Sequence, residues 1–285
     1  MGANMKKLLL SLAFLPVGGL VKAQRTHINI FAGAANYQGE LLFGVQSSKR
    51  FTLSQAKFAA GLGVEYELSN HLSLKGAITL GKIGADDKRS AIDPSRNLNF
   101  TSSITDAFAG VQYYITDPME HLVNPYVFAG LTVFRFNPYT SDSISKKIFL
   151  QPLSTEGQGF VSGREPYKLT QLALPFGGGL KFSLTDDLRI GFEVGFRKTF
   201  TDYLDDVSTT YVDEDLLRAN RGQRAVDLAF RGDELKTGAT YPAAGTERGI
   251  ARFKDWYYFT GISASVRLSS GEQRISRGRL GCPKI

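Results

Sequence analysis

The sequence predicts an all-β protein: an eight-stranded antiparallel transmembrane barrel of the bacterial outer-membrane type, with long external loops. Three observations lead to this prediction. The chain begins with the features of an export signal, its later segments alternate between apolar and polar residues, and short and long connections take turns along it.

The first 23 residues have the composition of a secretory signal peptide. Lys6 and Lys7 give a basic start, a short apolar run begins at Leu8, and a Val-Lys-Ala ending suits cleavage before Gln24. A membrane-spanning or buried helix is the alternative, and it is disfavoured because the run is short and Pro16 interrupts it. The chain from residue 24 onward is therefore expected to be exported.

Composition limits what the exported chain can be. Loss of residues 1–23 removes three lysines and no acid, so 34 Lys and Arg become 31 against 27 Asp and Glu, a net charge of +4. This mild and dispersed charge does not favour nucleic acid, so no nucleic-acid partner is expected. After the signal, no run of about 18 apolar residues occurs, which argues against a helical membrane protein.

Alternation with a period of two is clearest in two hairpins. Residues 58–68 and 72–80 each place large apolar side chains on one face and small or charged ones on the other, with three residues between them. Residues 171–184 and 188–196 repeat the pattern around a Thr-Asp-Asp turn. Less regular strands are expected at 27–36, 99–115, 126–136 and 256–268, which gives eight in all.

The connections sort into two classes that alternate along the chain. Those near 69–71, 116–124 and 185–187 are short, and those near 38–55, 83–97, 138–169 and 201–254 are long. All long loops therefore leave the same end of the sheet, as external loops do in outer-membrane barrels. The barrel is expected to span 24–269, and both termini, including a tail at 270–285, are expected in the periplasm.

A soluble barrel or sandwich is the alternative, with its apolar face turned inward. The membrane barrel is favoured because the faces opposite the Phe and Leu residues hold Gly, Ala and single charges, which suit a narrow lumen. Aromatic residues also gather at strand ends, at 113–114 and 256–258, where interface girdles would lie. Outer-membrane lipids are thus the expected surroundings.

Alternation also places charged side chains of both signs on the inner face. These predicted lumen residues are Glu65, Lys75, Lys181, Arg189, Glu193, Arg197 and Arg267. Eight strands close to a bore that side chains fill, and buried charges must be paired, so a salt-bridged lumen is favoured over an ion pathway.

The chain offers little for catalysis, and a cofactor is not expected. Its histidines, His27, His71 and His121, all fall near the predicted periplasmic end, and no HExxH, GxSxG or phosphate-loop pattern is present. One cysteine excludes a multi-cysteine metal site. The acids of the last long loop could bind calcium, but a solvated acidic loop is the favoured interpretation.

Cys282 lies beyond the last strand, in the tail "GEQRISRGRLGCPKI". A lone cysteine in an oxidising compartment suggests either a disulfide to another protein or a free thiol, and both alternatives stay open. Arg274, Arg277 and Arg279 of the same tail could meet an acidic partner, although a solvated tail is the default.

The last long loop is too complex in sequence to be a simple linker. Its "DEDLLRANRG" and "RAVDLAFRG" segments are expected to form short helical turns that stop at Gly222 and Gly232. A loop of about fifty residues is expected to be functional or disordered, and these helical turns favour an ordered cap over the barrel mouth.

This loop opens with "TDYLDDVSTTYVD", residues 201–213. With "NYQGEL" (36–41) and "KDWYYFTGISASVRL" (254–268), it resembles the PorG family of the type IX protein-secretion machinery over essentially the whole mature chain. The motif residues are Tyr203, Leu204, Asp205, Asp206, Ser208, Thr209, Tyr211 and Asp213. The chain departs from the family at Trp256 and in the irregular "AAGTERGIARF" before the last strand.

The resemblance implies a structural outer-membrane component rather than an enzyme. Members of that family associate with a periplasmic ring built from a lipoprotein and its partner protein, and cargo export depends on them. We therefore expect this chain to anchor such a ring, with the tail and Cys282 as candidate contacts. A stand-alone surface barrel that binds or adheres through its external loops is the alternative.

Overall fold

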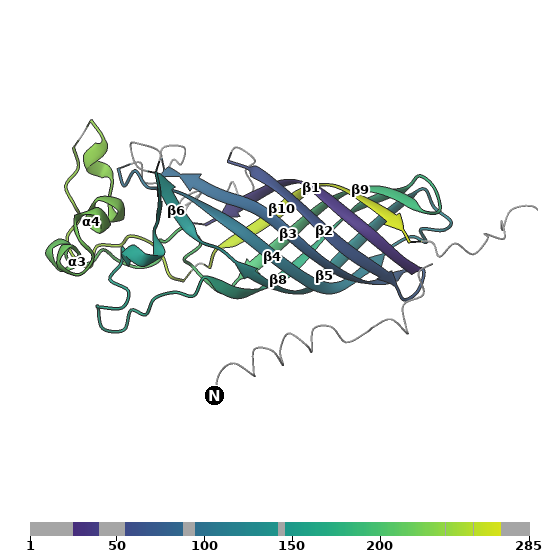
Figure 1. Ribbon diagram of the computed structural model, residues 1–285, viewed down its shortest axis with the longest axis horizontal. Coiled ribbons are helices and arrows are strands. Elements are labelled where there is room, and N and C mark those ends of the chain that lie inside the picture. Colours follow the sequence, from purple (N-terminus) through teal and green to yellow (C-terminus); the bar gives the residue numbers. More distant parts are fainter. Residues whose placement is uncertain are drawn as a thin grey trace, which may run out of the picture.

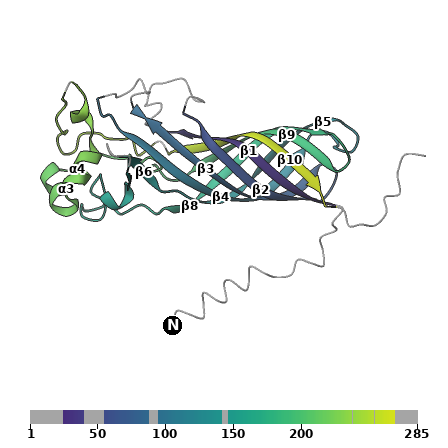
Figure 2. The same cartoon turned by 45° about the horizontal axis from the view of Figure 1, so that its top comes forward.

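The computed structural model describes residues 25–39, 55–87, 95–141, 146–236, 238–252 and 254–268. Eight long strands form a closed antiparallel barrel (Figures 1 and 2). They are β1 (Thr26–Gln38), β2 (Lys57–Glu67), β3 (Leu72–Asp86), β4 (Asn99–Tyr114), β5 (Val123–Arg135), β8 (Thr170–Ser183), β9 (Leu188–Thr199) and β10 (Trp256–Arg267). The β3–β4 pairing closes the circuit, so the predicted fold is confirmed.

The pairing register defines how steeply the strands wind around the barrel. A line of paired residues leaves β1 at Thr26, crosses all eight strands and returns to β1 at Asn36, ten residues further on. This stagger of ten residues over eight strands tilts every strand, as closure of a small barrel requires.

The two ends of the barrel differ in the length of their connections. Short turns join β2 to β3, β4 to β5 and β8 to β9, and β1 begins beside the last residues of β10, since His27 pairs with Arg267. We call this the turn end. The opposite end is called the cap end, because the long connections there form the cap seen beyond the barrel in Figure 1.

The cap consists of short elements from two long connections. The first holds β6 (Pro138–Ser141), β7 (Lys147–Phe149) and the 3-10 turn η4 (Gln151–Leu153), and the second holds α3 (Glu214–Arg221), α4 (Gln223–Ala229) and η5 (Gly232–Glu234). The β6–β7 hairpin was not predicted. The two helices were: α3 ends at Gly222 as expected, whereas α4 ends at Ala229, before Gly232.

Alternation along the strands separates two environments. Ile30, Leu62, Ile78, Leu131 and Ile262 point outward and are each more than half exposed. Their neighbours in sequence point inward and are polar, small or aromatic. An apolar outside around a charged inside is the reverse of a soluble barrel and suits a bilayer. None of the helices among the described residues is long and apolar enough to cross a membrane.

The aromatic clusters at the strand ends divide between the two faces. Tyr113 points outward and is half exposed, whereas Tyr114 points inward and is buried; Tyr257 likewise lies inside and Trp256 outside. Adjacent residues of a strand cannot share a face. The predicted girdles therefore receive only part of each cluster, and the inward members pack in the lumen.

Aromatic packing joins the cap end of the barrel to the cap. Phe134 packs against Phe136 and Tyr257, Phe136 stacks on Tyr167, and Tyr167 stacks on Tyr203 with ring centres 4.6 Å apart. The core thus continues from the lumen into the loops without a break.

An arginine on the outward face should destabilise the barrel in proportion to its depth in the bilayer. Ile78 lies in the middle of β3, and Ile78→Arg is expected to lower the free energy of unfolding by about 2–4 kcal/mol, because the guanidinium enters hydrocarbon. Leu122 is exposed in the turn between β4 and β5. Leu122→Arg is therefore the matched control and should lower the free energy of unfolding by only about 0–1 kcal/mol. Unfolding by urea in lipid vesicles measures both, and equal losses would contradict the membrane placement.

Candidate functional site

The lumen is crossed by ion pairs that join opposite walls. Lys75 Nζ lies 2.5 Å from Glu193 Oε2, and Lys181 Nζ lies 2.6 Å from Glu65 Oε2. Toward the cap, Arg197 Nε lies 3.1 Å from Asp106 Oδ2. Each side chain involved is nearly or fully buried, so its charge is neutralised by a partner rather than by water.

Glu67 gathers the remaining cations at the turn end. Its carboxylate lies 2.8 Å from Arg189 and 3.7 Å from both Arg267 and His27. The structure therefore brings all seven predicted lumen charges into ion pairs inside the barrel. The predicted set lacked two of the partners, Asp106 for Arg197 and Glu67 for Arg189 and Arg267.

Hydroxyl groups complete the lumen network. Tyr114 Oη and Gln112 Nε2 donate to Glu65 at 2.8 and 2.9 Å, and Tyr126 Oη donates to Glu193 at 2.8 Å. A cavity of about 40 Å³ remains between Asn29, Lys75 and the aromatic rings of the wall. This space holds about three water molecules, so the described lumen is packed and is not an open channel.

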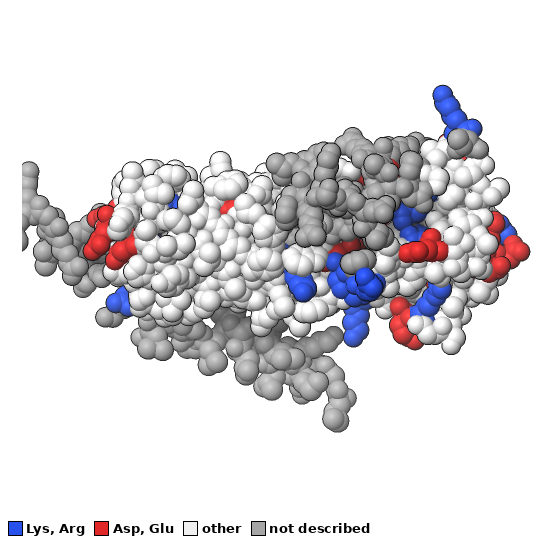
Figure 3. Space-filling model, turned by 180° about the vertical axis from the view of Figure 1, so that it is seen from behind, with Lys and Arg blue, Asp and Glu red and all other residues white. Residues whose placement is uncertain are grey.

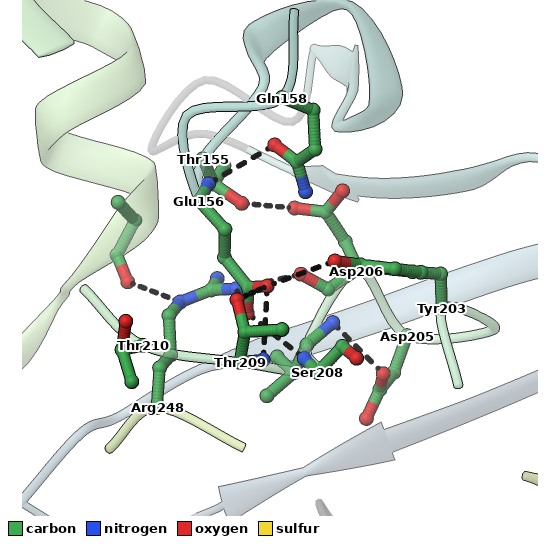
Figure 4. A network of polar contacts seen from close by, with 12 residues as sticks. Thr155, Glu156, Gln158, Tyr203, Asp205, Asp206, Ser208, Thr209, Thr210 and Arg248 are labelled. Atoms are coloured by element: carbon green, nitrogen blue, oxygen red, sulfur yellow. Dashed lines mark hydrogen bonds and ion pairs between the residues drawn. The ribbon is translucent and has the colours of Figure 1, made fainter. Parts of the chain in front are cut away.

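A buried glutamate organises the cap above this lumen (Figure 4). Glu156 accepts hydrogen bonds from the backbone amides of Ser208 and Thr209 at 2.8 and 3.0 Å, and from the Thr209 hydroxyl at 2.7 Å. Arg248 neutralises it at 2.9 Å and also donates to the backbone carbonyls of Asp206 and Ala229. One ion pair thus connects three distant segments of the chain.

The family motif is built into this network. Thr155 and Tyr167 each donate a hydroxyl to Asp206 at 2.6 Å, while Leu204 and Tyr211 are buried in the cap core. Asp213 caps the N-terminus of α3 by accepting from the Leu216 amide at 2.9 Å. Tyr203 donates to Glu156, and Asp206 adopts a positive φ of 69°, so the tight course of the backbone depends on these contacts.

The prediction of a solvated acidic loop is wrong for Asp202, Asp205 and Asp206. All three carboxylates are buried, because hydroxyls and backbone amides of the cap replace their water. Among the described residues, no group of three or more His, Cys, Asp or Glu side chains is arranged to hold a metal ion.

A tyrosine of β1 joins one of these acids, Asp205, to Asp255. Tyr37 Oη lies 2.7 Å from Asp205 Oδ2 and 2.9 Å from Asp255 Oδ1. A phenol carries one hydrogen and can donate to one carboxylate only. The second contact requires a proton on one of the two carboxyl groups, so this cluster holds an additional proton.

The acid–base properties of the cluster agree with that proton count. Burial raises the pKa of Asp202 and of Asp205 to about 7 and that of Asp206 to about 6. Burial, and then the charges of Asp205 and Asp202, raise the pKa of Asp255 well above its usual value. Each proton is therefore held more tightly in the folded cap than in an unfolded chain.

The remaining predicted site residues are placed as follows. His27, His71 and His121 lie at the turn end, far in the fold from the cap network. Cys282, Arg274, Arg277 and Arg279 lie outside the described residues. Glu156, Arg248, Tyr37 and Asp255, which organise the cap, were missed because no local sequence pattern joins them.

With this geometry established, comparison with known proteins places the chain in a family. The protein-family model described as "Domain of unknown function (DUF6089)" matches residues 6–221. The chain belongs to the DUF6089 family. No curated protein matches this DUF6089 member.

Solved structures with a similar course of the chain include three outer-membrane proteins. Ail of Yersinia pestis has a TM-score of 0.40 and 10% identity over 85% of this chain and 96% of its own, and OprG of Pseudomonas aeruginosa has 0.40 and 10% over 86% and 97%. A major outer membrane protein of Thermus thermophilus has 0.38 and 12% over 85% and 98%. From its own apolar exterior and paired interior, the DUF6089 chain is a barrel of the outer-membrane type.

Removal of the cap arginine should loosen the cap without opening the barrel. Arg248→Met leaves Glu156 as an unpaired buried charge, which is expected to cost about 3–5 kcal/mol locally. The exposed Arg218 pairs with two acids of α3, and Arg218→Met should cost only about 0–1 kcal/mol. Limited proteolysis within 200–255 measures cap opening, while heat-modifiable migration reports the barrel. Equal protease resistance in both variants would contradict the role of Arg248.

Cap stability should fall as pH rises. Because the folded-state pKa values of Asp202, Asp205 and Asp206 lie above the usual value of 3.8, the stabilisation is complete below about pH 4 and is lost through about pH 6–7. Each affected group contributes a slope of about 1.4 kcal/mol per pH unit within that window. Urea midpoints followed by fluorescence of Trp256, the single tryptophan, should be higher at about pH 5 than at about pH 8.

Asp205→Asn provides the control for this pH dependence. The amide keeps a hydrogen-bonding group beside Tyr37 at every pH and cannot ionise, so the slope should decrease. An unchanged slope in the variant would show that other groups carry the proton.

Proposed function

We propose that this chain is a structural outer-membrane component of the type IX protein-secretion machinery, which holds a periplasmic lipoprotein ring complex to the membrane. The filled lumen carries the proposal. Buried ion pairs and aromatic rings occupy the bore of the described barrel, so the molecule is not built to pass a solute and must work through its surfaces. The motif resemblance then selects the secretion machinery among surface functions.

The cap supports a structural role for the motif. The carboxylates and hydroxyls of 201–213 bond to one another and to Glu156 and Tyr37, and Arg248 donates to the backbone carbonyl of Asp206. These contacts leave the motif engaged in holding the loop. A catalytic site would need a nucleophile and a base exposed to substrate. We therefore propose that the protein is not an enzyme, and that its ordered cap serves assembly.

The turn end is the proposed contact with the ring. In the proposed orientation the short turns and both termini face the periplasm, where the tail beyond residue 268 would also emerge. Exposed acids at the turns, Glu120 and Asp186, and the basic tail residues Arg274, Arg277 and Arg279 offer charges of both signs to a partner. Cys282 could add a disulfide to a periplasmic protein, which would fix the tail to it covalently.

A pull-down in mild detergent from the native outer membrane tests this role. The tagged chain is expected to recover a periplasmic lipoprotein and its ring partner, and deletion of residues 270–285 should remove most of both while heat-modifiable migration persists. If Cys282 is bonded, part of the complex will also resist denaturant until reductant is added. Mass spectrometry of each fraction identifies the partners.

Two further variants separate the alternatives. Cys282→Ser tests the disulfide alone, and substitution of exposed cap residues such as Arg224→Gln tests the external loops. The assembly role would be contradicted if the variant without residues 270–285 kept every partner. The stand-alone surface barrel would be supported if, in addition, the cap variant lost binding to external surfaces.

A further inference from the structure

Three exposed cations lie on the outward face of the barrel near the cap end. Lys82 of β3, Arg135 of β5 and Lys198 of β9 each follow, two positions along the strand, an outward apolar residue. Those residues are Leu80, Val133 and Phe196, the last apolar side chains of each strand before the cap. We call the three cations the basic girdle.

The register places the basic girdle in one layer. The line of paired residues climbs ten residues over eight strands, or about 1.25 residues per strand. We count the height of a residue along the barrel in residues and correct it for this climb. On that scale Lys82, Arg135 and Lys198 lie within about 1.5 residues of one another. They therefore lie at a single level, on alternate strands from β3 through β5 to β9.

This layer coincides with the end of the apolar belt. Between the turn end and the girdle, the outward positions of the described strands carry no charged residue. A lipid-facing Lys or Arg costs about 2–4 kcal/mol at the bilayer midplane but only about 0–1 kcal/mol near an interface. The girdle thus marks the height at which hydrocarbon gives way to headgroups.

The three cations differ from those of the lumen in having no acidic partner. Every lumen cation is paired, whereas within the described ranges no carboxylate lies in ion-pair distance of Lys82, Arg135 or Lys198. The Lys198 ammonium lies over the ring of Trp256, 5.8 Å from its centre. Figure 3 shows basic side chains where the barrel wall meets the cap, with acidic ones among them and others at the turn end.

We propose that the basic girdle binds the phosphate groups of membrane lipids in the leaflet at the cap end. Ammonium and guanidinium groups form charge-assisted hydrogen bonds with phosphate oxygens. The apolar residues directly below would hold the acyl chains of the same lipid, which favours a lipid phosphate over phosphate in solution. In the orientation proposed above this is the outer leaflet, so the ligand is phosphorylated lipid A.

The experiment measures lipid A retained by the full chain after reconstitution in phosphatidylcholine nanodiscs that contain a small fraction of lipid A. Native mass spectrometry counts the lipid that stays bound after extraction. The triple variant Lys82→Gln, Arg135→Gln, Lys198→Gln should bind lipid A roughly a hundredfold more weakly, about fivefold for each cation lost.

Three exposed cations of the cap give a charge-matched control. Lys147→Gln, Arg224→Gln and Lys236→Gln together remove the same charge above the membrane level and should leave lipid A binding unchanged. Heat-modifiable migration verifies that both triple variants fold. Equal loss in the two variants, or no loss in either, would overturn the proposal, as would displacement of the lipid by excess inorganic phosphate.

Discussion

The narrow bore of an eight-stranded barrel is the constraint on which the rest of this structure depends. Side chains fill such a bore, so a charge placed there cannot keep its water and must meet a partner. Lys75 and Glu193 join β3 to β9, and Lys181 and Glu65 join β8 to β2. These pairs link opposite walls and also close the lumen, so the same contacts that hold the barrel make it unsuitable as a pore.

In the cap, outside the strands, buried polar and charged groups likewise need partners. Its backbone has little regular structure, so buried carboxylates, hydroxyls and amides of the loops must satisfy one another. Glu156 accepts from two amides and a hydroxyl while Arg248 neutralises it, and Asp206 accepts from two hydroxyls. In the loop segments these side-chain contacts take the place of a strand ladder.

The sequence predicts the barrel well because alternation is local. The alternation is visible within each strand, and even the inward charges follow from their odd or even position along it. Asp106 escaped this reasoning because its inward neighbours, Ile104 and Phe108, are apolar and hide the usual contrast between faces. The cap could not be derived in this way: Glu156 and Arg248 are 92 residues apart, and an acid that will be buried looks the same in sequence as a solvated one.

The seam between β1 and β10 is one of the places where the cap is fastened to the rim of the barrel. At this seam Tyr37 pairs with Tyr257. Tyr37 at this seam reaches Asp205 of the motif and Asp255, the residue before β10. The first strand, the last strand and the cap thus converge on one phenol, and only an additional proton satisfies both of its acidic neighbours. Closure of the barrel, order of the cap and protonation of the seam are therefore coupled through the same contact.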